Sequence, residues 1–187
     1  MEAFLASTLV VAIAEIGDKT QLLAIVLAAR FRRPLAITLG ILVATLANHA
    51  LAGLFGQFLG HLMTPVVMRW VVGLSFLSMA AWALIPDKPD DADRPLDRFG
   101  PFVATLVAFF LVEIGDKTQI ATVALAARFP SVVAVVIGTT LGIMLANIPA
   151  VIFGDIAAGR LPMKLIRAVA AAIFAGLGLF TLLGFAA

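Results

Sequence analysis

Two short stretches of the sequence carry acidic, basic and amide side chains at spacings that could bind a metal ion. Residues 15–21 read EIGDKTQ, and the same seven letters recur at residues 113–119. Each copy has a glutamate, an aspartate three residues later and a lysine directly after the aspartate. Residues three apart on an α-helix share a face, with Cβ atoms about 5–6 Å apart. The two carboxylates of each stretch can therefore point at one ligand.

The donor atoms of these stretches favour a divalent cation that prefers oxygen ligands. Four carboxylates and two lysines leave a charge of −2 if all are ionised. Carboxylate oxygens suit Mn²⁺, Ca²⁺ or Mg²⁺ and disfavour soft metals. Without a cation, four facing carboxylates repel one another and should be partly protonated. The predicted metal ligands are Glu15, Asp18, Glu113 and Asp116.

Other polar residues could support this site or add ligands to it. In a regular helix the glutamine of each stretch lies near the carboxylate face and the threonine points away. Each lysine follows its glutamate at i+4, the favourable order for a Glu–Lys pair. The glycine between the acids also permits local unwinding, which would expose backbone carbonyls. Two asparagines in apolar stretches could add an amide oxygen or bond across helices. These additional candidates are Gln21, Gln119, Lys19, Lys117, Thr20, Thr118, Asn48 and Asn147.

The chain that positions these residues has the composition of a membrane protein. Of its 187 residues, 63% are hydrophobic and 13% are charged, and the mean hydropathy is +1.12. A soluble domain averages about 45–50% apolar and about 25% charged residues. This composition argues against a soluble enzyme or a nucleic-acid binder. The absence of cysteine from the sequence excludes disulfides, thiolate metal sites and thiol catalysis.

Six apolar stretches are long enough to cross a bilayer, which needs about 20 mostly apolar residues. Glu15 and Glu113 lie about 18 Å into the first and fourth stretches, near the middle of the membrane. Ionisable groups at that depth cost about 2.5–3.5 kcal/mol each and usually mark an ion or proton path. The six predicted spans are approximately residues 3–29, 34–59, 66–85, 101–127, 132–153 and 165–183.

The charged stretches belong to a longer internal repeat. Residues 15–31 and 113–129 agree at twelve of seventeen positions, 98 residues apart, and the match continues without a gap. In that register Asn147 corresponds to His49, and pairing it with Asn48 needs a one-residue shift. Each half has three helices, an odd number, so the two halves must enter the membrane from opposite sides. Such inverted repeats are common in secondary transporters.

We therefore predict an all-α integral membrane protein with six transmembrane helices in two inverted-topology three-helix repeats. The repeats are residues 1–85 and 101–187, and an acidic loop at residues 86–100 joins them. Basic residues gather on the side of this loop, whereas only Arg69 and Arg128 lie opposite. Cytoplasmic loops carry the excess of lysine and arginine. We expect the loop to be cytoplasmic and both termini to be extracytoplasmic, in the cell (inner) membrane.

The doubled Glu-x-Gly-Asp-Lys-Thr pattern of Glu15–Thr20 and Glu113–Thr118 resembles the Gdt-type family of cation transporters. That family includes Golgi manganese/calcium transporters and bacterial manganese exporters. The resemblance covers essentially the whole chain, including the basic run Arg30–Arg33. It implies export of Mn²⁺ or Ca²⁺ from the cytosol in exchange for protons, with the four motif carboxylates binding the cation. The length resembles that of bacterial members, which favours Mn²⁺ by analogy.

Three other functions stay open from the sequence. A Ca²⁺/H⁺ exchanger would use the same site. An intramembrane aspartyl protease would use Asp18 and Asp116 as a dyad, but it would not need two glutamates, two lysines and an inverted repeat. A passive channel would carry a flux independent of a pH gradient. We expect a transporter rather than an enzyme, with no cofactor and no nucleic-acid partner. Its partners would be a divalent metal ion, protons and the lipid bilayer, and the sequence does not decide the oligomeric state.

Overall fold

The computed structural model describes residues 1–85, 99–157 and 163–184. The predicted all-helical class is confirmed for these residues, whereas the acidic loop at 86–98 lies outside them. The helices, in chain order, are α1 (Glu2–Glu15), α2 (Lys19–Phe31), α3 (Pro34–Leu62), α4 (Pro65–Ala83), α5 (Gly100–Glu113), α6 (Lys117–Arg128), α7 (Val132–Ala157) and α8 (Met163–Leu182).

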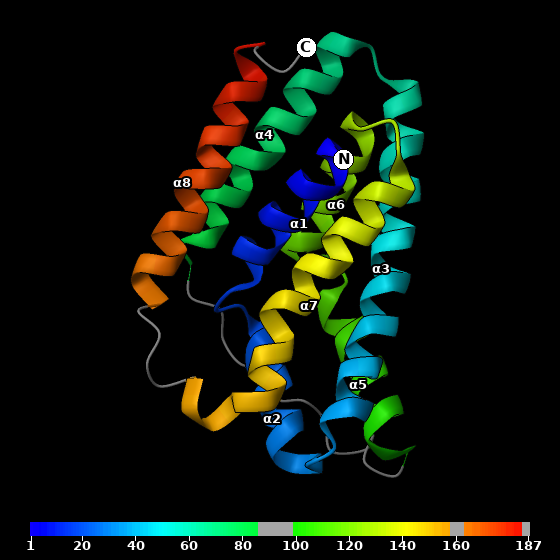
Figure 1. Cartoon of the computed structure of the whole chain (residues 1–187). Coiled ribbons are helices and arrows are strands. Elements are labelled where there is room, and N and C mark those ends of the chain that lie inside the picture. Colours follow the sequence, from blue (N-terminus) through cyan, green and yellow to red (C-terminus); the bar gives the residue numbers. More distant parts are fainter. Residues whose placement is uncertain (86–98, 158–162, 185–187) are drawn as a thin grey trace.

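The offset of 98 residues between the charged stretches also relates the helices. α1 and α5 end at Glu15 and Glu113, α2 and α6 begin at Lys19 and Lys117, and the later helices begin at the same spacing. In Figure 1 the chain descends through α1 and α2, rises through α3 and descends through α4. α5 and α6 instead rise, α7 descends and α8 rises. Equivalent helices of the two halves therefore run in opposite directions.

The first and fourth predicted spans are each divided between two helices. α1 and α2 have 14 and 13 residues and are separated at residues 16–18. α5 and α6 have 14 and 12 residues and are separated at residues 114–116. A glycine in the left-handed region of φ lies in each break, at Gly17 and Gly115. The unwinding that these glycines permit is what the structure adopts.

Three of the described helices are long and apolar enough to cross a membrane alone: Pro34–Leu62, Pro65–Ala83 and Val132–Phe153. Gly100–Glu113 and Arg167–Leu182 are shorter apolar helices. Large apolar side chains cover the outside of the longer helices, with Leu51 60% and Trp70 50% exposed. This pattern is typical of a protein surrounded by lipid. The arrangement as six spans stays a prediction.

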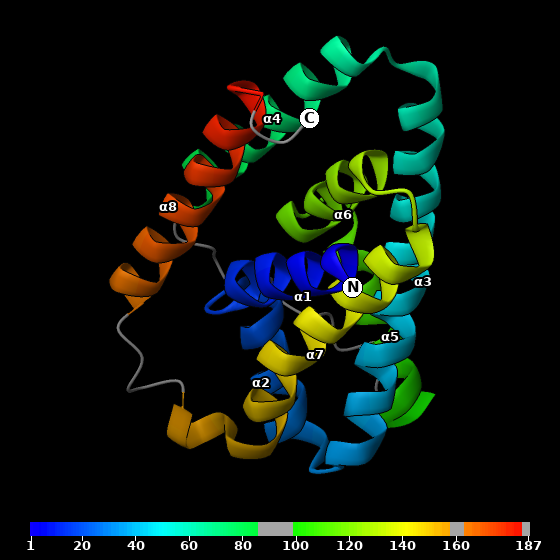
Figure 2. The same cartoon turned by 45° about the horizontal axis from the view of Figure 1, so that its top comes forward.

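Contacts between the two halves build much of the core. α1 packs on α7, α3 packs on α5 and α6, and α4 packs on α8. Figures 1 and 2 both show α4 and α8 side by side. Glycines permit close approach of the backbones: a Cβ atom on Gly56 of α3 would lie 2.3 Å from the Val123 carbonyl oxygen of α6. Small residues at helix contacts are typical of membrane proteins, where van der Waals packing drives helix association.

Candidate cation site

Both charged stretches lie at the breaks between helices. Glu15 is the last residue of α1, and Asp18 is the N-cap residue of α2. The Asp18 amide donates to the Glu15 carbonyl oxygen over 3.0 Å, so a tight turn joins the two helices. Glu113 and Asp116 form the same turn in the second half, with a distance of 3.1 Å. The positive φ of the glycine, 80° and 77° in the two turns, lets the backbone leave the helix and begin the next one within a few residues.

The two glutamines hold these turns closed. The Gly17 amide donates to Gln21 Oε1 over 2.9 Å, and the Gly115 amide donates to Gln119 Oε1 over 2.7 Å. Gln21 Nε2 also donates to the Ala146 carbonyl oxygen of α7 over 3.0 Å. Each glutamine carbonyl oxygen is therefore bonded to the backbone of its own turn. In this conformation the glutamines support the site rather than contribute free oxygens to it.

All four predicted carboxylate ligands are buried, and the threonines are within hydrogen-bonding distance of three of them. Thr20 Oγ1 donates to Glu15 Oε1. The Thr118 hydroxyl group donates a hydrogen bond to Glu113 Oε2 over 3.3 Å. In a regular helix the threonines would point away from the glutamates, but the helices are broken here. The turn between the helices rotates the threonine onto the side of the glutamate.

The lysines pair with the aspartates of the opposite half. Lys117 Nζ lies 2.9 Å from Asp18 Oδ1, and Lys19 Nζ lies 3.5 Å from Asp116 Oδ1. The Lys117 side chain is only 6% exposed and that of Lys19 is 22% exposed. The structure thus contains two reciprocal ion pairs between the halves. These pairs bring the two charged stretches together in space.

The polar residues of α3 and α7 differ in what they contact. Asn147 Nδ2 donates to Glu15 Oε1 over 3.0 Å. Asn48 Nδ2 donates to the Phe110 carbonyl oxygen over 2.9 Å, which is a bond across helices. His49, which the sequence analysis did not include among the site residues, places Nε2 3.8 Å from Glu113 Oε2. The signal that could have found it is the gap-free register of the repeat, in which His49 corresponds to Asn147.

The site has unused oxygen atoms but not a closed metal cage. Within the described ranges, no group of three or more carboxylate or imidazole residues has an arrangement that could hold a metal ion. Glu15 Oε2, Glu113 Oε1 and Asn147 Oδ1 are buried without a hydrogen-bond partner in that part of the chain. Buried polar atoms usually have such partners. The site therefore retains capacity for a ligand, with lysine ammonium groups beside its aspartates.

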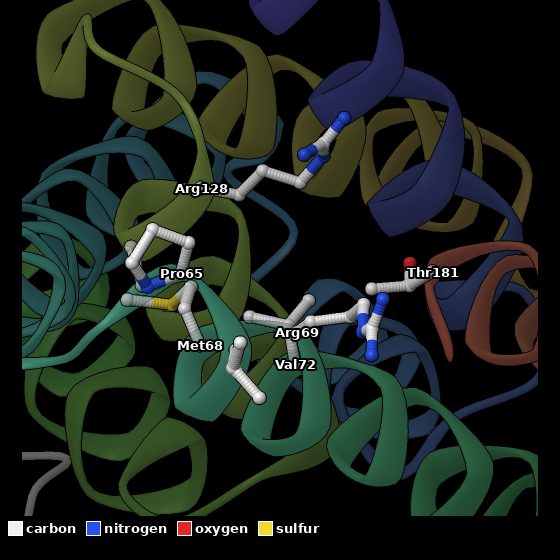
Figure 3. Close-up of a pocket in the computed structure, with 8 residues that line it drawn as sticks. Pro65, Met68, Arg69, Val72, Arg128 and Thr181 are labelled. Atoms are coloured by element: carbon white, nitrogen blue, oxygen red, sulfur yellow. The ribbon is translucent and has the colours of Figure 1, made fainter. Parts of the chain in front are cut away.

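A separate cavity of about 260 Å³ lies between α4, α6 and the end of α8. Figure 3 shows the two arginines that line it, Arg69 and Arg128. None of its lining residues is a carboxylate or one of the predicted ligands. Its positive side chains would repel a metal ion, so this cavity is not the cation site.

Comparison with known proteins identifies similar sequences along nearly the whole chain. The family model described as divalent cation/proton antiporter GDT1 matches residues 3–91 and 101–186. A Vibrio cholerae protein named "Putative manganese exporter" is 48% identical over 182 residues, covering 97% of this chain and 90% of that protein. A GDT1-like protein of Synechocystis is 29% identical, covering 93% of each chain. GDT1-like protein 3 of rice is 25% identical, covering 94% of this chain and 71% of the relative. No solved structure matches.

Proposed function

Because the chain belongs to the GDT1 family of divalent cation/proton antiporters and is a cation transporter rather than an enzyme, we propose that it exports Mn²⁺ from the cytosol in exchange for protons. The observation that carries this proposal is the pair of buried Glu–Asp stretches joined by reciprocal ion pairs. Buried ionisable groups in a membrane protein usually mark an ion or proton path. The relative named as a manganese exporter supports Mn²⁺ over Ca²⁺.

The proposed ligands are the four buried carboxylates. In the conformation described here, the lysine ammonium groups take the place of a cation at the two aspartates. A divalent cation that enters must displace them and draw the glutamates inward. The unpartnered oxygens of both glutamates can accept that cation. The proposed ligands are Glu15, Asp18, Glu113 and Asp116.

Proton exchange follows from the chemistry of these ligands. Carboxylates must be deprotonated to hold a metal ion, so metal binding releases protons. A site that carries either one divalent cation or about two protons has the same charge in both states. An inward proton gradient would then drive cation export, since protons from outside reload the empty carboxylates.

The proposed membrane arrangement uses both broken segments as discontinuous spans. α1 and α2 together would form one span, and α5 and α6 together another. Discontinuous helices near the midplane commonly build the substrate sites of transporters with inverted repeats. The halves would rock around the site and open it alternately to each side. In this arrangement the loop at residues 86–100 is cytoplasmic, both termini are extracytoplasmic and the protein lies in the inner membrane.

Flux into proteoliposomes tests the proposal. We expect Mn²⁺ movement to exceed Ca²⁺ movement, to be accelerated by an opposing pH gradient and to change the internal pH. Each of Glu15→Gln, Asp18→Asn, Glu113→Gln and Asp116→Asn should abolish or severely impair transport while the protein still inserts. Glu2→Gln, which alters an exposed glutamate, is the matched control.

Two results would overturn parts of this reading. Equal flux with the pH gradient collapsed, and no proton movement, would indicate a channel or uniporter. Preferential Ca²⁺ movement would indicate a Ca²⁺/H⁺ exchanger. The protease alternative has no support, because the family to which the chain belongs consists of divalent cation/proton antiporters.

A further inference from the structure

His49 is a buried side chain with a ring nitrogen that lacks a hydrogen-bond partner. It lies on α3 with no exposed surface. Its Nε2 has no hydrogen bond in the described part of the structure and faces Glu113 Oε2 at 3.8 Å. That distance exceeds a hydrogen bond. Two donors that each lie about 2.1–2.2 Å from one first-row divalent ion are about 3.0–4.4 Å apart, so the spacing suits two ligands of one cation.

The other ring nitrogen indicates which tautomer is present. His49 Nδ1 lies 2.8 Å from Thr139 Oγ1. The Thr139 hydroxyl has a single proton, and it donates to the Val136 carbonyl oxygen over 3.1 Å. We therefore assign a proton to Nδ1, which donates it to Thr139 and leaves a lone pair on Nε2. Metal-binding histidines are commonly held in orientation by such a hydrogen bond from the ring nitrogen that does not bind the metal.

The equivalent position in the other half carries an amide instead. Asn147 donates its Nδ2 protons to Glu15 Oε1 and to the Ile143 carbonyl oxygen. The repeated site is therefore asymmetric at this position. One glutamate receives a hydrogen bond from an amide, whereas the other faces a nitrogen lone pair. The carboxylates, lysines and threonines are the same in the two halves, so this is a chemical difference between otherwise matching stretches.

We propose that His49 Nε2 is a ligand of the transported cation and selects a transition-metal ion over Ca²⁺ and Mg²⁺. This inference rests on the proposed function. Ca²⁺ and Mg²⁺ take oxygen ligands, whereas imidazole nitrogen suits transition metals. A site with carboxylate oxygens alone would have little basis for rejecting Ca²⁺. One nitrogen among those oxygens supplies that basis without a thiolate.

Pulsed electron paramagnetic resonance of Mn²⁺ bound to the purified protein tests the ligand directly. The chain has only two histidines, His49 and His61. We expect the bound ion to show coupling to nitrogen that changes when histidine is labelled with ¹⁵N. The coupling should disappear in His49→Asn and persist in His61→Asn, which alters the exposed histidine. The wild-type spectrum needs no variant, so the test survives if His49→Asn fails to fold.

Transport selectivity gives a second readout. His49→Asn makes this position of the two halves alike. We expect this variant to lower the preference for Mn²⁺ over Ca²⁺ by at least about tenfold. That factor is the low end of the loss in metal affinity when a residue that only supports a metal ligand is removed. Wild-type Mn²⁺ transport without histidine coupling would overturn this inference and leave the proposed function intact. An absence of Mn²⁺ binding and transport would overturn both.

The cavity between α4, α6 and α8 carries a second inference, which rests on the proposed membrane arrangement. We name it the arginine pocket; its lining is Pro65, Val66, Met68, Arg69, Val72, Ala127, Arg128 and Thr181. Figure 3 shows the two arginine side chains extending in the same general direction from different helices. Within the described residues, neither arginine has a carboxylate partner, and Arg69 Nε is buried without a hydrogen-bond partner. Two guanidinium groups in an apolar wall suit a phosphate group.

The position of the arginine pocket indicates where that phosphate comes from. Pro65 begins α4, Arg128 ends α6 and Thr181 lies one residue before the end of α8. In the proposed membrane arrangement these helix ends lie at the level of the lipid headgroups. The geometry points to the phosphate of a phospholipid, with its chains along the apolar wall formed by residues such as Met68 and Val72.

Lipid titration of the detergent-purified protein tests this second inference. We expect phosphatidylglycerol to raise the thermal unfolding midpoint and to remain bound in native mass spectrometry. The double variant Arg69→Gln/Arg128→Gln should bind it at least about tenfold more weakly, as expected for loss of charged hydrogen bonds. The control is Arg167→Gln/Arg30→Gln, at the equivalent positions of the other half. An equal loss in the control, or no loss in the test variant, would overturn the inference. Saturation by inorganic phosphate alone would show a free-anion site and overturn the lipid assignment.

Discussion

Replacing Lys117 by methionine should raise the affinity of the site for Mn²⁺. Any cation that binds Asp18 must compete with the Lys117 ammonium group, which lies 2.9 Å from Asp18 Oδ1. At an effective dielectric constant of about 20, two unit charges at that distance attract by about 6 kcal/mol. The Lys19–Asp116 pair, at 3.5 Å, gives about 5 kcal/mol on the same basis. Lys19 is also 22% exposed, so solvent screens its pair further.

Only part of this attraction should appear as a gain in the binding free energy of Mn²⁺ when the lysine is removed. Desolvation offsets much of the Coulomb energy of a buried pair. If a quarter of the Lys117–Asp18 attraction, about 1.4 kcal/mol, is gained by the metal ion, its dissociation constant changes tenfold. We therefore expect the Kd for Mn²⁺ to fall at least about tenfold in Lys117→Met and by a smaller factor in Lys19→Met. Export should slow in Lys117→Met, because a cation held more tightly leaves the site more slowly.

The measurement is Mn²⁺ binding to the purified variants by calorimetry, with the free ion followed by paramagnetic resonance. Lys164→Met, which removes an exposed lysine, is the control. Without metal, Lys117→Met should be destabilised by about 3–5 kcal/mol, because it leaves Asp18 as a buried charge without its ammonium partner. Mn²⁺ should restore that stability, since ligands stabilise the state they bind. An unchanged or higher Kd in a correctly folded Lys117→Met protein would refute the competition. A larger effect in Lys19→Met would refute the reasoning from distance.

Three further predictions concern packing, orientation and coupling. Gly56→Ala should lower the unfolding midpoint, because its methyl group would meet the Val123 carbonyl oxygen at 2.3 Å. The expected loss of folding free energy is about 1–3 kcal/mol or more. The control is Gly176→Ala, whose methyl group meets nothing within 4 Å, and it should be neutral or stabilising by up to about 1 kcal/mol. A cysteine at Ala92 in this cysteine-free chain should react with a permeant reagent and resist an impermeant one, and labelling from outside intact cells would contradict the orientation. Raising the external pH should slow export in vesicles, because fewer protons are available to reload the carboxylates, and a rate independent of external pH would contradict the exchange.

The buried acidic cluster could be predicted from the sequence, because each charged stretch is short and the same stretch occurs twice. Identical letters 98 residues apart identified Glu15 and Glu113 as equivalent, and the length of the apolar runs predicted that both would be buried. The gap-free register also held the information that His49 and Asn147 are equivalent. Residue identity alone instead pairs Asn147 with Asn48, which lies one position before the equivalent His49.

The contacts within the site could not be predicted from spacing alone. Helical spacing placed Thr20 away from Glu15, whereas the turn at Gly17 brings them into contact. The glycine showed that a break was possible, but only the path of the whole chain determines whether it forms. The partner of Lys117 is likewise set by packing between the halves, because Asp18 is remote in sequence and adjacent in space.

The reciprocal ion pairs also have a consequence for biogenesis. Asp18 and Lys19 leave the ribosome 98 residues before Asp116 and Lys117. At a synthesis rate of about 5–20 residues per second, that separation corresponds to about 5–20 s. Throughout this interval the first half has neither of its partner charges, so its charged turn cannot take its final place in the bilayer interior at low cost. The turn must wait near water or beside the insertion machinery until the second half arrives, and a truncated first half should be a substrate for membrane quality control.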